Sequence, residues 1–264
     1  MIEVGNMNRV APALARGQLE GAYNRVSPAL TRETVHSINL GKRVGLPGPS
    51  PLPEARGRSA APVEAPMKAA PAPRQLKRPD MLRPAQRGQK VALGIRQGVR
   101  TQLRVGFGWN VKDARCDIDA SAFLLTPAKR VPSDEWFVFY GQPESPDGAV
   151  RFEQDGRVDR QVISVDLGRL RADIERIVFV MTIDESLQRR LNFGMIAEVW
   201  LRVLDPSGRE IVSYAPTELY ENVTSMTLGE LYLRNGEWRF NPVGNGVNTD
   251  LAGQCAVYGV EISE

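Results

Sequence analysis

Two carboxylates and a hydroxyl stand two residues apart where an apolar stretch begins, in Asp117-Ile118-Asp119-Ala120-Ser121. In an extended strand, side chains two apart share a face, so these three polar side chains are predicted to line one side. Carboxylates crowded on one face repel each other and require a positive partner. A set of oxygen donors favours a hard cation such as calcium over zinc or copper. One alternative is that one acid caps a backbone N–H and the other pairs with an arginine such as Arg115.

Further acids follow along the chain and are candidates for the remaining oxygens of a six- to eight-coordinate calcium ion. Asp155 and Asp159 lie in one short acidic segment, and Asp147 lies in a Ser-Pro-Asp-Gly sequence. Loops gathered at one end of a sandwich would bring such residues together. The spacing does not match an EF-hand loop. For Asp147 the turn geometry of its own sequence is an equally good explanation.

The sequence lacks the residues that several kinds of enzymatic catalysis require. The single histidine, His36, lies far from the rest of the chemistry, so a Ser-His-Asp or Cys-His device has no base. No glycine-rich phosphate loop precedes a predicted helix. Cys116 and Cys255 are too few for a disulfide scaffold or a zinc site. We therefore expect a protein that is not an enzyme.

The chain divides into a basic arm and an acidic body. Residues 1–90 hold 15 Lys and Arg against 6 Asp and Glu, and the remaining residues hold 19 against 25. The arm also holds 12 of the 19 prolines, which predicts a mostly disordered segment that cannot bury enough apolar surface to fold. Within it, Val10–Leu19 is a possible short helix and Thr34–Leu40 a possible short strand. We predict an arm over residues 1–88 and a folded domain over residues 89–264.

The body shows the period-two pattern of an all-β protein. Leu103, Val105, Phe107 and Trp109 alternate with polar or small residues, and Asn235-Gly236 separates two short apolar runs as in a tight hairpin. Short strands with turn punctuation predict a β-sandwich with Greek-key-like connections. No secretory signal and no apolar run long enough for a membrane helix is visible, so we expect a cytoplasmic protein.

A series of motifs in the body resembles the TerD family of tellurium-resistance and stress proteins. They occur in the family's order and cover about residues 90–262. The motifs are Gly108-Trp109-Asn110, Asp117-Ile118-Asp119-Ala120-Ser121-Ala122-Phe123-Leu124-Leu125, Phe137-Val138-Phe139-Tyr140, Ser145-Pro146-Asp147-Gly148, Asn192-Phe193-Gly194-Met195 and Asn235-Gly236-Glu237-Trp238-Arg239-Phe240.

The resemblance implies a β-sandwich that binds calcium through acidic loops and serves in bacterial tellurite and stress resistance. It implies a binding or scaffold role near the membrane, with other stress-response or tellurium-resistance proteins as partners. Asp117 and Asp119 are then the surest ligands, with Asp147 next. The full set of candidate metal ligands is Asp117, Asp119, Asp147, Asn110, Ser121, Asp155 and Asp159.

The sequence departs from the family pattern at positions that bear on this site. The family usually has Asp where Asn110 stands, and the acidic loop is shortened to Glu153–Asp159 with Arg157 inside it. Because charge count tunes calcium affinity, we predict that at least one of the family's metal sites is weakened or lost.

The basic arm suggests two further functions to consider, one as an adaptor and one in nucleic-acid binding. The protein would be a metal-independent adaptor if its arm docks partners or an anionic membrane surface at the inner membrane face. Nucleic-acid binding through the arm is not expected, because Tyr23 is the arm's only aromatic residue for base stacking.

Overall fold

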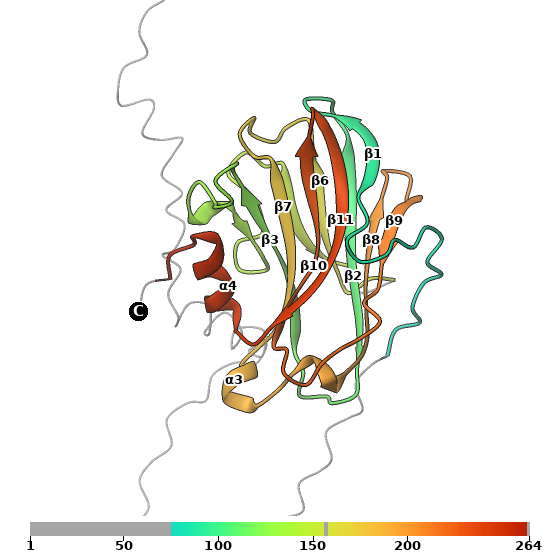
Figure 1. Cartoon of the computed structure of the whole chain (residues 1–264), viewed down its shortest axis with the longest axis vertical. Coiled ribbons are helices and arrows are strands. Elements are labelled where there is room, and N and C mark those ends of the chain that lie inside the picture. Colours follow the sequence, from blue (N-terminus) through green and yellow to red (C-terminus); the bar gives the residue numbers. More distant parts are fainter. Residues whose placement is uncertain (1–74, 156–157, 263–264) are drawn as a thin grey trace, which may run out of the picture.

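A computed structural model describes residues 75–155 and 158–262, which form two antiparallel β-sheets packed face to face (Figure 1). One sheet has the strand order β1-β11-β10-β7-β3-β4, and the other has the order β5-β6-β2-β8-β9. The chain crosses repeatedly from one sheet to the other. The strands are β1 (Val91–Arg96), β2 (Gln102–Val111), β3 (Ile118–Leu125), β4 (Phe137–Val138), β5 (Val150–Gln154), β6 (Gln161–Asp166), β7 (Arg176–Ile183), β8 (Ile196–Leu204), β9 (Glu210–Tyr214), β10 (Ser225–Arg234) and β11 (Glu237–Val247).

The core lies between the sheets and follows the alternation of the sequence. Leu103, Val105 and Phe107 on β2 are buried, and the ring of Phe107 lies 5.7 Å from that of Phe179 on β7 in the opposite sheet. Burial of such side chains is the main term that holds two sheets together. The prediction of an all-β sandwich is confirmed.

The hairpin between β10 and β11 also forms as its sequence predicts. Asn235 and Gly236 both have positive φ, at 53° and 72°, which a two-residue turn of this type requires. The paired strands continue from Arg234↔Glu237 to Ser225↔Val247. A local turn signal is therefore enough to set this register.

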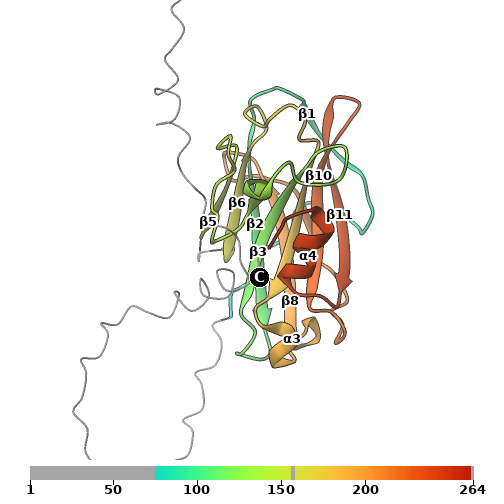
Figure 2. The same cartoon turned by 90° about the vertical axis from the view of Figure 1, so that its left-hand side faces the viewer.

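Within residues 75–155 and 158–262, the helices are few and short. They are η1 (Asp134–Trp136), α3 (Ser186–Arg189), η2 (Phe193–Met195) and α4 (Leu251–Tyr258). The sequence pattern missed α4, whose N-terminus is capped by the Asp250 side chain accepting from the Gly253 N–H. Tyr258 at its end lies 4.5 Å from Phe123 of β3, so α4 packs on the six-stranded sheet (Figure 2).

Residues 75–88, here called the strap, lie against the sandwich before β1 begins. The strap contacts β2 at Leu76, then pairs with the outer side of β9, where the Ala85 N–H donates to the Ser213 carbonyl at 2.8 Å. It reaches the other sheet at Gly88, whose N–H donates to the carbonyl of Pro242. These contacts cover an edge strand that would otherwise present unpaired backbone groups.

The predicted disorder of the arm concerns mainly residues 1–74, which lie outside the described residues. The predicted Val10–Leu19 helix and Thr34–Leu40 strand lie there too. The domain boundary at residue 88 stays a prediction. Within the described ranges, no helix is both long and apolar enough to cross a membrane.

Candidate functional site

Asp117, Asp119 and Asp184 gather at one end of the six-stranded sheet, where β3 begins and β7 ends. Ile118 pairs with Ile183, and the N–H of Asp184 donates to the carbonyl of Asp117 at 2.8 Å. Asp117 and Asp184 are therefore cross-strand neighbours, and Asp119 lies two residues further on the same face. We call these three residues the acidic cluster.

Two acidic groups at this end of the sheet have raised pKa values. Partial burial, followed by the charges of Glu185, Asp117 and Asp119, raises the pKa of Asp184 above its ordinary value. Burial, followed by the charges of Asp119, Asp184 and Asp117, raises the pKa of the Tyr140 phenol. In both cases burial is the larger cause, and the neighbouring carboxylates add to it in the same direction.

Asp119 is held in place from the opposite sheet. Its side chain is 8% exposed, and its Oδ1 accepts from Nε2 of Gln161 on β6 at 2.7 Å. The Oε1 of Gln161 accepts from the Ala120 N–H at 2.6 Å. One amide thus links the two sheets and fixes one carboxylate oxygen of the cluster.

Arg115 pairs with an acid outside the cluster. Its guanidinium donates to both carboxylate oxygens of Asp113, and these bonds lower the pKa of Asp113 to about 2. Asp113 lies in the loop between β2 and β3, so this pair shapes the loop that leads to Asp117.

Asp147 forms a turn at the opposite end of β5. Its Oδ1 accepts from the Ser145 hydroxyl at 2.6 Å and from the Ala149 N–H at 3.0 Å, and its Oδ2 accepts from the Arg171 N–H. At about 3.3 Å per residue, β5 alone separates this turn from the Gln161 end by roughly 13 Å. Asp147 is therefore not brought to the acidic cluster, and its oxygens serve the turn.

Asp159 is buried in an ion pair on the outer face of the five-stranded sheet. Its carboxylate accepts from Arg202 at 2.6 Å and from Nε1 of Trp200 at 3.0 Å, and the side chain is 2% exposed. A Cβ added at Gly106 would fall 2.3 Å from its Oδ2. The glycine therefore makes room for the carboxylate, which is a structural anchor.

Asn110 binds the strap. Its Oδ1 accepts from the N–H of Leu76 and its Nδ2 donates to the carbonyl of Leu76, both at 2.8 Å. Nδ2 also donates to Oε1 of Glu198 at 2.6 Å. A carboxylate at this position could accept from the Leu76 N–H but could not donate to the Leu76 carbonyl. The amide of Asn110 is therefore suited to binding the backbone of the strap.

The two remaining predicted residues lie apart. Ser121 is buried and its hydroxyl donates to the Val180 carbonyl at 3.4 Å. Asp155 lies half-buried in the β5–β6 connection, with its N–H donating to the Arg160 carbonyl.

The structure thus brings together two of the seven predicted ligands, Asp117 and Asp119. In the described part of the chain, no three His, Cys, Asp or Glu side chains converge as a metal-binding group. A cation at the acidic cluster would therefore need water and backbone oxygens to complete its coordination.

The sequence reasoning missed Asp184, Glu185 and Tyr140. Asp184 directly follows the predicted strand that ends at Ile183, and Tyr140 closes the aromatic run. Asp184 and Glu185 come near Asp117 through the pairing of β3 with β7, and Tyr140 comes near it through the pairing of β3 with β4; no local pattern specifies either pairing.

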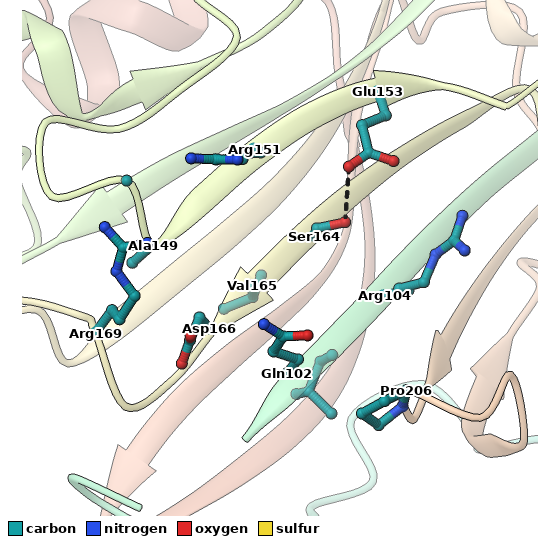
Figure 3. Close-up of a pocket in the computed structure, with 12 residues that line it drawn as sticks. Gln102, Arg104, Ala149, Arg151, Glu153, Ser164, Val165, Asp166, Arg169 and Pro206 are labelled. Atoms are coloured by element: carbon teal, nitrogen blue, oxygen red, sulfur yellow. Dashed lines mark hydrogen bonds between the residues drawn. The ribbon is translucent and has the colours of Figure 1, made fainter. Parts of the chain in front are cut away.

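A hollow of about 330 Å³ lies elsewhere, over the outer face of β2, β5 and β6 (Figure 3). Its charges are mixed: Arg104, Arg151 and Arg169 face it together with Glu153 and Asp166. With opposite charges interspersed, this surface favours no ligand of one sign.

Comparison with known proteins adds a family to this geometry. A family model described as the TerD domain matches residues 81–258. A tellurium resistance protein TerD from Serratia marcescens is 34% identical over 186 residues, covering 67% of this chain and 97% of that protein. General stress protein 16U from Bacillus subtilis is 32% identical over the same length, covering 67% of this chain and 96% of that protein.

A crystal structure of a homologue of a telluride resistance protein from Streptomyces coelicolor is 17% identical. It covers 58% of this chain and 94% of that chain with a TM-score of 0.44, an overlap too low to add to the fold described above.

Proposed function

The chain belongs to the TerD family, and we propose that it acts in bacterial stress or tellurite resistance as a calcium-binding module without enzymatic activity. The names of its relatives support the stress and tellurium part of this proposal. The acidic cluster supports the calcium part.

The observation that carries the proposal is the cross-strand pair of Asp117 and Asp184 with Asp119 beside it. Like charges directly opposite each other on neighbouring strands are destabilising. A divalent cation would be attracted by carboxylates placed this way, and the pKa of Asp184 is raised first by burial and then by the charges of Glu185, Asp117 and Asp119.

The donors of the cluster suit calcium in type but not in number. Three carboxylates offer hard oxygen ligands, while Asp147 and Asp159 are committed elsewhere. We therefore propose a single site of reduced affinity at the acidic cluster, where Asp117, Asp119 and Asp184 do not converge on one point and would have to draw together around the ion to serve as its ligands. Its role would be to order the loops that meet at this end of the sandwich.

The second candidate is a metal-independent adaptor, and it is favoured by the commitments of Asn110, Asp147 and Asp159 to protein contacts. In that case the sandwich is a rigid support for an arm that docks partners. Such partners would be other stress-response or tellurium-resistance proteins, or the anionic inner face of the cytoplasmic membrane.

Thermal unfolding of the full chain in calcium and in chelator separates the two candidates. Calcium bound only by the folded state raises the midpoint in proportion to the logarithm of its concentration. We expect such a rise, and an equal rise in an Asp147→Asn variant. A midpoint that does not change with calcium supports the adaptor. Binding to vesicles with and without anionic lipid then tests the membrane role of the arm.

A further inference from the structure

The hollow in Figure 3 lies where three neighbouring strands place a small side chain between long ones. Ser164 on β6 pairs with Arg104 on β2 and with Arg151 on β5, so the three side chains share a face of the sheet. Because the serine is short and half-buried, it forms a floor between the two arginines. Glu153 and Gln102, each two residues from one of these arginines, stand on the same face.

Most of the charges around the hollow already have partners in the protein. Arg151 donates to Glu144 at 2.8 Å, and Arg169 donates to a backbone carbonyl at 2.9 Å. Asp166 is 7% exposed, and its carboxylate accepts from a backbone N–H at 3.1 Å. These three side chains therefore shape the walls of the hollow more than they offer charge to a ligand.

One positive and one negative side chain remain on opposite sides of the floor. Arg104 is exposed, and within residues 75–155 and 158–262 its guanidinium has no ion pair or hydrogen bond. Glu153 is exposed too, and in the same ranges its carboxylate accepts one hydrogen bond, from the Ser164 hydroxyl at a long 3.4 Å. Figure 3 shows these three residues around the same part of the hollow.

Arg104 and Glu153 face one hollow with opposite charges and do not pair with each other. Their strands are separated by β6, which places their Cα atoms at least roughly 10 Å apart. The hollow measures about 330 Å³, and pockets for small molecules measure roughly 300–1,000 Å³. A small ligand can therefore stand between the two charged groups.

We propose that this hollow binds free α-amino acids in their zwitterionic form. The ligand's carboxylate accepts two parallel hydrogen bonds from the guanidinium of Arg104, and its ammonium group donates to the carboxylate of Glu153. The hydroxyl of Ser164 and the carboxamide of Gln102 supply further hydrogen bonds to either end. A ligand with only one charge makes only one of the two ion pairs. The proposal does not depend on calcium or on the acidic cluster.

The exposure of the two charged groups sets the strength of binding. Water and salt screen ion pairs between exposed groups, so we expect a dissociation constant on the order of 1 mM that rises with salt concentration. An interaction of this strength is measured by NMR chemical-shift titration of the isotope-labelled full chain.

The titration uses the common α-amino acids, added one at a time. For the tightest of them, the methyl ester keeps only the positive charge and the N-acetyl derivative keeps only the negative charge. We expect saturable shifts of the Arg104 and Ser164 amides, and binding of both derivatives at least roughly threefold weaker. An absence of saturable shifts with every amino acid would overturn the proposal, as would equal binding of either derivative.

Substitutions at the two charged positions test the assignment of residues. Arg104→Gln and Glu153→Gln should each weaken binding at least roughly threefold, because each removes one ion pair. Both positions are exposed, so the fold should be unaffected. Arg96→Gln is the matched control, since Arg96 is exposed on β1 in the other sheet, and it should bind as the wild type does. Unchanged binding in either variant, or an equal loss in the control, would overturn the proposal.

Discussion

The carboxamide of Gln161 in one sheet holds the carboxylate of Asp119 in the other, with 2.7 Å between Nε2 and Oδ1. The same side chain accepts from the Ala120 N–H. This link joins the two sheets beside the acidic cluster. The position of Asp119 therefore depends on how the two sheets pack against each other.

Replacing Gln161 should therefore cost stability. Gln161→Leu leaves the Ala120 N–H and one oxygen of Asp119 without this partner, and we expect a loss of about 1–3 kcal/mol in the free energy of unfolding. Chemical denaturation measures it. Gln154→Leu is the matched control, because Gln154 is exposed on β5 directly opposite Gln161. If both variants lose equally little, the link is not structural.

Asp159→Asn should destabilise the protein without affecting calcium. The change removes the negative partner of Arg202 from a buried pair, at a cost of about 3–5 kcal/mol. Asp155→Asn, at a half-buried position, should cost less than about 0.5 kcal/mol. Denaturation and calcium titration of the folded variants check both statements. A lost calcium response in Asp159→Asn would place this residue in the metal site after all.

Asn110→Asp should release the strap. The carboxylate has no donor for the Leu76 carbonyl and would face Glu198 at the distance of the present hydrogen bond. We expect faster amide exchange at Leu76 and a loss of about 1–3 kcal/mol. If the exchange rate at Leu76 stays the same, the side chain of Asn110 does not hold the strap.

Asp184 should make stability depend on pH. Its pKa in the folded protein lies above the ordinary 3.8, so the folded state binds this proton more tightly than the unfolded state does. The resulting contribution to the free energy of unfolding is fully present below about pH 3.8 and is lost as the pH rises through the folded pKa. Asp184→Asn removes this loss. In calcium-free buffer, the variant should therefore gain more stability relative to the wild type at about pH 7 than at about pH 4. An equal difference at both pH values would show that the folded pKa of Asp184 is not raised.

The strands were predictable because their signals are local. Alternation along β2 and the Asn235-Gly236 turn need only neighbouring residues to be recognised. The helix α4 was missed, because its packing on Phe123 comes from a distant part of the chain.

The candidate site was predictable only in part, because its chemistry depends on register. The sequence placed Asp117 and Asp119 on one face, and they lie together. It could not place Asp184 opposite them, which requires knowing that β3 pairs with β7. Nor could it show that Asp159 pairs with Arg202, 43 residues away.

Calorimetric titration of the full chain with calcium tests the central claim most directly. We predict one binding event, reduced at least roughly tenfold in affinity by Asp119→Asn or Asp184→Asn, since each removes a charged ligand. Asp147→Asn should bind as the wild type does. The account would be contradicted by an absence of binding in the wild type, by two tight sites, or by unchanged binding in Asp119→Asn.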